Sequence, residues 1–324
     1  MTAPDKIPTK AALIAGFATI YLVWGSTYLG IKIAVETLPP FLMAGARFLV
    51  AGGLLAGWIA FTRGFHTTRR QWFDNAIVGG LLLLGGNGLV SWAEQKIPSG
   101  IATLIISLGP LFIVLLDWAV HAISGHQNQG TKPSPATFLG VGLGFIGLLV
   151  LVGPQLGEGT TDLDPWRLGG IVLACFSWSA GSLYTRYARN SADPFTASAM
   201  QMLAGSLWLF LVSLLIGEPA HFHFADVSAR SWGAWVYLII AGSLIGFTTF
   251  VWLMKHCSPA RVATYAYVNP IVAVFLGWWL AHEPIGPRLF VAAAIIIAGV
   301  AIITTTKNKI PVDSLAPPSE TKSP

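Results

Sequence analysis

The chain has 324 residues, of which 54% are hydrophobic and only 10% are charged, with a net charge of +5 and a mean hydropathy of +0.66. Soluble globular domains carry about 25% charged residues, so this composition excludes an ordinary soluble protein and indicates a chain dissolved in lipid. The positive charge forms no basic run, which excludes nucleic acid as a partner. Cys175 and Cys257 are too few for a disulfide framework and lack metal-ligand spacing, so we expect neither a metal nor a cofactor.

Ten apolar segments follow one another along the chain, each close to the ~20 residues that a helix needs to cross hydrocarbon. They cover residues 11–34, 41–61, 75–93, 98–119, 136–153, 166–187, 194–216, 231–254, 259–281 and 286–306. The sequence therefore predicts an all-α polytopic membrane protein with ten transmembrane helices. The tail, 307–324, is rich in Pro, Ser, Thr and Lys, and we expect it to be a disordered cytoplasmic segment.

Lysine and arginine are unevenly divided between the two sides of the predicted membrane. If the N-terminus faces the cytoplasm, 13 of the 19 basic residues lie on the inner side and 6 on the outer side. Short cytoplasmic loops usually carry the excess of Lys and Arg. An even number of spans then places both termini of this multi-pass protein in the cytoplasm.

The first segment returns later in the chain. The stretch YLVWGSTYLGIK at 21–32 matches CFSWSAGSLYTR at 175–186, which places Trp178 under Trp24 at an offset of 154 residues. A repeat of this length indicates a unit that is built twice.

We place the two halves at 11–153 and 160–306, with five spans in each. Five is an odd number, so the second half enters the membrane upside down. Inverted repeats are typical of secondary transporters, which bind substrate near the midplane and give alternating access to the two sides.

Two tryptophans near the centres of their spans are candidate substrate contacts. Trp24 in the first segment and Trp178 in the sixth lie away from the interfacial belt, where Trp is a common anchor. Small and hydroxyl-bearing residues flank both, and we expect Ser26, Thr27 and Ser182 to contact substrate as well. The alternative is helix packing, because small residues let backbones approach closely in lipid.

Polar side chains also lie deep in the third and ninth segments. Asn87 and Trp92 belong to the glycine-rich third segment, where Asn87 must find a hydrogen-bond partner. Tyr265 and Asn269 lie at positions i and i+4, on one face of the ninth segment. We predict that these residues contact substrate.

Prolines inside two segments predict helix breaks. Pro110 in the fourth segment and Pro270 in the ninth each remove a backbone hydrogen bond. Broken helices bend around a cavity and expose carbonyl groups to it in many carriers, so we expect both breaks to lie beside the substrate site.

Charges inside or at the ends of spans are expensive and usually functional. Lys32 and Arg186 lie near span ends, where their long side chains can reach the interface. We expect structural or gating roles for both, and also for Glu94.

Arg47 lies about 10 Å into the second span, by the rise of a helix. We expect it to form a structural ion pair with Glu36 or Glu94, and binding of substrate is the alternative. The second half has Gln201 at the position of Arg47, so this charge is not repeated.

Four stretches together resemble the EamA family of the drug/metabolite transporter superfamily, in particular its YedA-like bacterial inner-membrane exporters. They are WGSTYLGIK at 24–32, PPFLMAGARFLVAGGLL at 39–55, GNGLVSWAEQKIPSGIATLI at 86–105 and SPARVATYAYVNPIVAVFLGWWLAHEP at 258–284. The resemblance covers the chain from 11 to 306. It implies a 5+5 inverted repeat around a central cavity, a place in the bacterial inner membrane, and efflux of small metabolites or drugs. The cavity liners that it implies are Trp24, Asn87, Trp92, Ser107, Trp178, Trp252, Tyr265 and Asn269.

The sequence thus predicts a secondary transporter that exports small metabolites, such as amino acids or amphipathic and aromatic compounds, or drugs. The alternatives are an importer of the same superfamily and a passive channel, which conducts faster than a carrier and shows no counter-flow. A membrane enzyme is disfavoured, because the sequence has no nucleophile elbow, phosphate loop or metal-spaced pair of histidines. Gly140, Gly144 and Gly147 form a small-residue face that is compatible with a homodimer.

Overall fold

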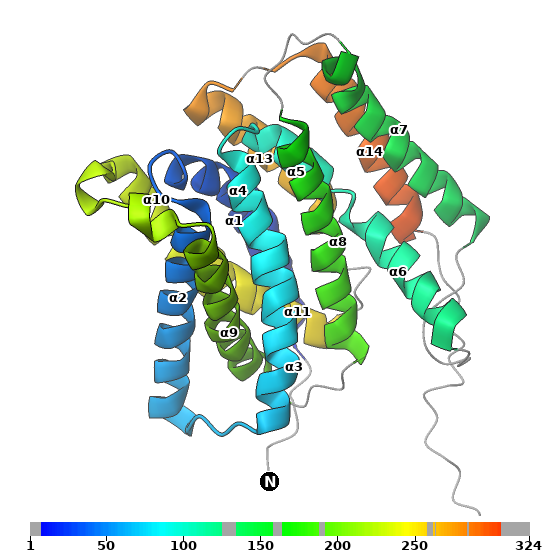
Figure 1. Cartoon of the computed structure of the whole chain (residues 1–324). Coiled ribbons are helices and arrows are strands. Elements are labelled where there is room, and N and C mark those ends of the chain that lie inside the picture. Colours follow the sequence, from blue (N-terminus) through cyan, green and yellow to red (C-terminus); the bar gives the residue numbers. More distant parts are fainter. Residues whose placement is uncertain are drawn as a thin grey trace, which may run out of the picture.

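The computed structural model describes residues 8–124, 134–157, 164–187, 192–257, 262, 264–283 and 285–305, and these form a bundle of helices without strands (Figure 1). The helices of the first half are α1 (Lys10–Ala34), α2 (Pro40–Arg63), α3 (Arg69–Gly79), η1 (Gly80–Gly88), α4 (Leu89–Glu94), α5 (Ser99–Ile106), α6 (Gly109–Ser124) and α7 (Pro135–Gly157). Those of the second half are α8 (Pro165–Tyr187), α9 (Pro194–Leu215), η2 (Glu218–His221), η3 (Phe224–Asp226), α10 (Ala229–Tyr237), η4 (Leu238–Phe247), α11 (Thr248–His256), α13 (Tyr265–Ala281) and α14 (Pro287–Thr305).

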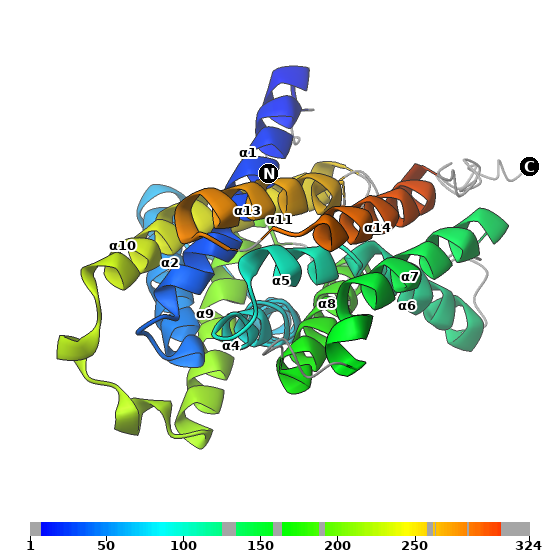
Figure 2. The same ribbon diagram turned by 90° about the horizontal axis from the view of Figure 1, so that it is seen from above.

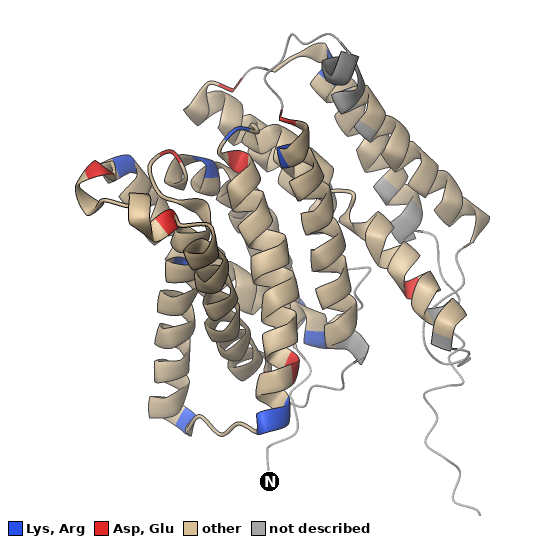
Figure 3. Ribbon diagram, in the orientation of Figure 1, with Lys and Arg blue, Asp and Glu red and all other residues tan. Residues whose placement is uncertain are grey.

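Seven helical stretches among the described residues are long and apolar enough to cross a membrane. Three shorter apolar helices, Pro135–Gly147, Val268–Ala281 and Pro287–Gly299, lie at the remaining predicted segments. The prediction of an all-α polytopic membrane protein is confirmed. Charged residues gather at the two ends of the bundle and leave its middle nearly free of them (Figure 3), as expected for helices in hydrocarbon. The predicted tail, 307–324, lies outside the described residues.

The third span of each half contains a π-helical stretch that the sequence did not predict. An α-helix leads into a π-helix and then into a second α-helix, as α3, η1 and α4 in the first half and as α10, η4 and α11 in the second. Glycines on the π-helices leave room for tryptophans. A methyl carbon at Gly86 would lie 2.7 Å from Cε3 of Trp178, and one at Gly246 would lie 2.7 Å from Nε1 of Trp24. π-Helical turns are frequent at functional sites, and here each receives the repeated tryptophan of the other half.

The contacts between the halves are symmetric: where a span of one half packs on a span of the other, the equivalent spans also pack on each other. α2 packs on α9 and α7 on α14, and each pair joins equivalent spans (Figure 2). α1 packs on α13, and in the exchanged contact α8 packs on α5 and α6. α1 also packs on α10, η4 and α11, whereas α8 packs on α3, η1 and α4. α1 and α8, which carry Trp24 and Trp178, are therefore equivalent elements of the interface between the halves.

The glycine face of α7, which suggested a homodimer, is used inside the chain. A methyl carbon at Gly147 would lie 2.6 Å from Cγ1 of Ile296 on α14. One at Gly299 of α14 would lie 2.7 Å from the carbonyl oxygen of Gly140. These small residues let α7 and α14 approach closely, and they are not available for a second copy of the chain.

The two predicted helix breaks differ. The helix is interrupted next to Pro110, because α5 ends at Ile106 and α6 begins at Gly109. Pro110 thus lies in the first turn of α6, where a missing N–H is tolerated. α13 continues through Pro270, contrary to the break expected there. The first four N–H groups of a helix have no acceptor within the helix. Pro270 is the sixth residue of α13, just beyond this first turn, so it removes only one hydrogen bond of the helix.

Glutamates of the second half close the N-termini of α2 and α5 in the first half. Glu218 accepts hydrogen bonds from two backbone N–H groups at the start of α2, at 3.2 and 2.7 Å. Glu283 accepts from the N–H groups of Ser99 (2.8 Å) and Gly100 (3.3 Å) at the start of α5. The prolines that precede the two helices offer no side-chain cap. The carboxylates therefore accept hydrogen bonds from backbone N–H groups that have no acceptor within the helix, and their negative charge interacts favourably with the positive end of the helix dipole.

We expect Glu283→Ala to lower the free energy of unfolding by about 1–2 kcal/mol, because the N–H groups at the start of α5 lose their acceptor. Glu283→Gln should lose less, since its amide oxygen still accepts. The control is Glu36→Ala, which removes an exposed carboxylate 3.9 Å from Arg230 and should cost less than about 0.5 kcal/mol. Thermal unfolding in detergent measures the difference, and equal melting temperatures for the two alanine variants would contradict a capping role.

Candidate functional site

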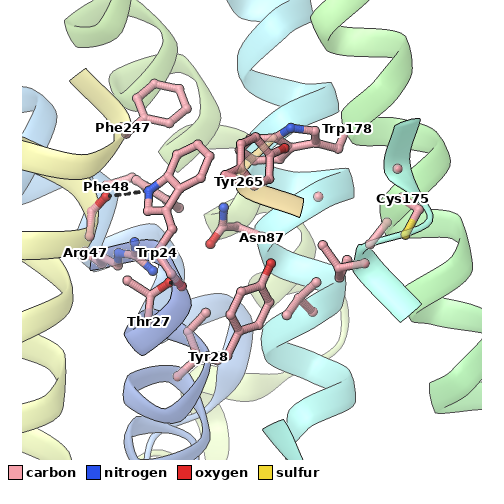
Figure 4. A pocket seen from close by; sticks show the side chains of 17 residues that line it. Trp24, Thr27, Tyr28, Arg47, Phe48, Asn87, Cys175, Trp178, Phe247 and Tyr265 are labelled. Carbon is pink, nitrogen blue, oxygen red and sulfur yellow. Dashed lines mark hydrogen bonds between the residues drawn. The ribbon is translucent and has the colours of Figure 1, made fainter. Parts of the chain in front are cut away.

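A small cavity lies between helices of both halves (Figure 4). Its volume is about 70 Å³, and its walls come from α1, α2, η1, α4, α5 and α6 in the first half and from α8, η4 and α13 in the second. Five of the residues predicted to contact substrate line it: Trp24, Thr27, Asn87, Trp178 and Tyr265. The interface between the halves thus gathers side chains that are far apart in the sequence.

Aromatic rings form one side of the cavity. The ring of Trp24 meets that of Trp178 edge to face, with centroids 5.5 Å apart, and meets Tyr265 in the same way at 5.3 Å. Phe250 of α11 lies 4.9 Å from Trp24 and 5.7 Å from Trp178. Nε1 of Trp24 donates to the carbonyl oxygen of Gly242 at 3.4 Å (dashed in Figure 4). Edge-to-face contacts of this kind stabilise the packing of the rings, which present apolar surface to the cavity.

Three predicted hydroxyl contacts are not among the cavity-lining residues. Ser26 bonds to the hydroxyl of Tyr237 and donates to the carbonyl oxygen of Val23 at 2.7 Å. Ser107 and Ser182 each donate to a carbonyl oxygen of their own helical turn, at 2.6 and 2.8 Å. A serine hydroxyl often bonds to the preceding turn of its own helix. The three hydroxyls therefore already have hydrogen-bond partners within the protein.

Trp92, Trp252 and Asn269 also lie outside the cavity lining. The ring of Trp92 packs under the guanidinium of Arg167, 4.2 Å from its centre. Trp252 packs on α1 at Gly16 and on the ring of His256. Asn269 joins α13 to α1, because its amide nitrogen in the orientation that satisfies both partners donates to the carbonyl oxygens of Tyr265 (3.2 Å) and Tyr21 (3.1 Å). Trp92 and Asn269 lie on helices that reach the cavity, but on other faces of them, whereas Trp252 lies on α11, which contributes no lining residue.

The cavity also contains residues that sequence reasoning did not place there. Tyr28 lines it, and the i, i+4 spacing from Trp24 was a signal for this. Phe48 and Phe247 line it as well, and no sequence signal distinguished them from the many other apolar residues of their spans. Phe247 reaches the cavity from the end of η4, so its direction depends on the π-helical register.

The ion pair predicted for Arg47 with Glu36 or Glu94 is wrong. Arg47 instead lines the cavity, and its Nε donates to Oγ of Ser243 on η4 at 2.7 Å. Glu36 lies 3.9 Å from Arg230. The first half thus meets the second half at this point through a hydrogen bond to a neutral hydroxyl, and no ion pair among the described residues includes Arg47.

Lys32 and Glu94 meet where α1 passes the end of α4. Nζ of Lys32 donates to the carbonyl oxygens of Glu94 (2.7 Å) and Ile97 (3.4 Å), which closes the C-terminal end of α4. The side chain of Glu94 is fully buried, and neither of its carboxylate oxygens has a hydrogen-bond donor among the described residues. Lys32 therefore has a structural contact, and its gating role stays a prediction. Arg186 lies near the end of α8, and its side chain is outside the part that the structure describes.

Comparison with known families identifies the chain. The model of the EamA-like transporter family matches residues 11–153 and again 166–305, which together are most of the chain. The chain belongs to the EamA-like transporter family. The family resemblance inferred from the sequence is thereby confirmed, and this EamA-like transporter contains two copies of the family domain.

Relatives of this transporter include proteins of bacteria and of a plant. It is 33% identical over 313 residues to the uncharacterized inner membrane transporter YedA of Escherichia coli strain K12, a match that covers 96% of this chain and 95% of YedA. It is 22% identical to the uncharacterized transporter YoaV of Bacillus subtilis strain 168, with 92% of this chain and 98% of YoaV covered. It is 23% identical to a chloroplastic WAT1-related protein of Arabidopsis thaliana, with 87% and 67% covered. A crystal structure with a TM-score of 0.63 and 24% identity, covering 92% of this chain and 98% of that one, shares the fold.

Proposed function

We propose that the chain is a secondary transporter that exports small amphipathic metabolites or drugs across the bacterial inner membrane by alternating access. Its two halves act as inverted repeats, with both termini in the cytoplasm. The family membership supports transport, and the contacts that persist when the halves are exchanged support the paired halves. The excess of Lys and Arg on one side supports the orientation, and the direction of transport follows from the resemblance to exporters.

The cavity carries this proposal. Pockets that enclose metabolite-sized ligands measure about 300–1,000 Å³, whereas this cavity measures about 70 Å³. Because its walls belong to both halves, a solute is accommodated only when the halves move relative to each other. Such a movement is the central step of a carrier, whereas a passive channel keeps a path open without it.

The lining of the cavity favours an amphipathic solute. The rings of Trp24, Trp178 and Tyr265 offer apolar surface to an aromatic or aliphatic part. The amide of Asn87 and the hydroxyl of Thr27 stand beside them as polar groups. A few polar groups among apolar walls orient a ligand in this kind of site.

Counter-flow in proteoliposomes tests the proposal. The panel consists of radiolabelled amino acids, aromatic acids, aromatic amines and a cationic dye. Preloading with the unlabelled solute should accelerate uptake of the labelled solute, because a carrier returns faster when it is loaded. Fast flux without acceleration would indicate a channel, and no flux with any panel member would contradict transport of small amphipathic solutes. Uptake into inside-out vesicles, compared with right-side-out vesicles, tests the direction.

A further inference from the structure

We propose that Arg47 binds an anionic group of the substrate, so that the transported solute is an amphipathic monoanion such as an aromatic carboxylate. This inference rests on the proposed transport function and names the chemical class of the solute. The sequence alone favoured a structural ion pair for Arg47, and the observed surroundings of its guanidinium favour the alternative.

The guanidinium of Arg47 lies in the cavity wall without a counter-charge. Arg47 is 3% exposed, its Nε donates to Ser243, and its guanidinium carbon lies 4.7 Å from the ring centre of Phe48. Its Nη1 is buried and has no acceptor, and none of the ion pairs in the described ranges includes Arg47. Figure 4 shows the guanidinium close to Trp24 and Thr27, which also line the cavity. Arg47 therefore contributes a guanidinium to the cavity wall, and one buried nitrogen of this group has no acceptor among the described residues.

The second half shows that helix packing does not require this charge. Gln201 of α9 repeats the position of Arg47. Its amide nitrogen donates to Oδ1 of Asn75 on α3 at 2.9 Å, so the crossing of α9 with the third span of the other half uses a neutral amide pair. The crossing of α2 with η4 is the counterpart, and it uses a buried guanidinium. Packing alone therefore does not explain the charge of Arg47.

An anionic solute would satisfy this guanidinium. A buried charge is costly unless it is paired and hydrogen-bonded, and a guanidinium matches the two oxygens of a carboxylate. A neutral solute could offer Nη1 an acceptor but no negative charge, and a cationic solute would meet a like charge. The apolar part of the anion would lie against Trp24 and the neighbouring rings.

Three compounds that share a phenyl ring and differ in charge test the proposal: phenylacetate, phenylacetamide and phenethylamine. Binding to the purified full-length protein in nanodiscs is followed by the fluorescence of its tryptophans. Wild type should bind phenylacetate at least tenfold more tightly than phenylacetamide, because the guanidinium forms a stronger hydrogen bond with a charged carboxylate than with a neutral amide oxygen. Arg47→Gln introduces the residue that the other half has at this position, and it should reduce the difference to less than twofold. Arg47→Lys should keep part of it.

Arg288→Gln is the matched control. Arg288 also has a buried nitrogen, Nη2, without an acceptor, but it lies outside the cavity lining, where its Nε donates to the carbonyl oxygen of Val150 at 2.7 Å. This variant should keep the wild-type preference for the anion. If Arg47→Gln does not fold, Ser243→Ala removes the hydrogen bond that orients the guanidinium and should reduce the preference several-fold.

Equal binding of phenylacetate and phenylacetamide by wild type would overturn the proposal. The proposal would also be overturned if Arg47→Gln kept the wild-type preference for phenylacetate over phenylacetamide. If Arg47→Gln does not fold, the same result with Ser243→Ala would overturn it. If phenylacetamide or phenethylamine showed counter-flow and phenylacetate did not, the proposed anion site would be wrong, but the proposed transport function would still hold. Failure of all panel solutes to show counter-flow would count against transport itself.

Discussion

Trp24→Ala is expected to reduce counter-flow at least tenfold for any solute that the wild-type protein carries. Trp24 contacts three rings of the second half, those of Trp178, Phe250 and Tyr265. Its removal takes away a large apolar surface of the cavity and the contact through which the two repeated tryptophans meet. Truncation of a large aromatic side chain costs about 3 kcal/mol or more where it is packed, so the variant should also melt at a lower temperature.

A matched tryptophan separates the loss of binding from the loss of stability. Trp235 of α10 is also partly buried, donates from Nε1 to the carbonyl oxygen of Met43 at 3.1 Å, and meets Trp232 edge to face at 5.4 Å. It is not among the cavity-lining residues. Trp235→Ala should therefore lower the melting temperature but keep counter-flow per folded molecule. If Trp24→Ala retained counter-flow at the level of Trp235→Ala, Trp24 would be a packing residue and the aromatic site would be wrong.

Gly79→Ala is expected to disrupt the folded protein. A methyl carbon at Gly79 of α3 would lie 2.6 Å from the carbonyl oxygen of Gln201 and 2.9 Å from the backbone nitrogen of Gly205, both on α9. These are backbone atoms, so the clash is relieved only when the two helices move apart. Overpacking usually costs about 1–3 kcal/mol, and a clash with backbone should reach or exceed the upper end of that range. We expect little monodisperse protein in size-exclusion chromatography and a clearly lower melting temperature.

Gly53→Ala provides the control for the same chemical change. A methyl carbon at Gly53, in the middle of α2, would have no described atom within 4 Å apart from its chain neighbours and the backbone of the adjacent turns of α2. Alanine is a better helix former than glycine by about 1 kcal/mol, so this variant should be as stable as wild type or more stable. Equal melting temperatures for Gly79→Ala and Gly53→Ala would show that the crossing of α3 and α9 is looser than the structure indicates.

The course of the helices was predictable from the sequence because the bilayer imposes a simple rule. A span needs about 20 apolar residues, and its backbone hydrogen bonds must be made within the helix. The first segment, predicted at 11–34, is α1 at Lys10–Ala34, and the seventh, predicted at 194–216, is α9 at Pro194–Leu215. The internal repeat also singled out Trp24 and Trp178, whose rings are in contact in the structure.

The composition of the cavity was less predictable, because it depends on how each helix is rotated and where it crosses the others. Ser26 and Thr27 are neighbours on α1, yet only Thr27 lines the cavity. Successive helical residues point about 100° apart, and the sequence does not contain the absolute rotation. Trp252 and Phe250 illustrate the same limit on α11, where the unpredicted Phe250 joins the ring cluster and Trp252 packs on α1.

Composition, segment length and repetition along the chain were enough to predict the class of protein, the order of its apolar helices and the existence of two related halves. The tertiary structure alone decided that η1 and η4 are π-helical, that Arg47 meets Ser243 and not Glu36 or Glu94, and that α13 continues through Pro270. Each of these depends on contacts between residues that are distant in the chain, or on competition between local hydrogen bonds and packing. Long-range contacts and this competition leave no periodic signal in the sequence.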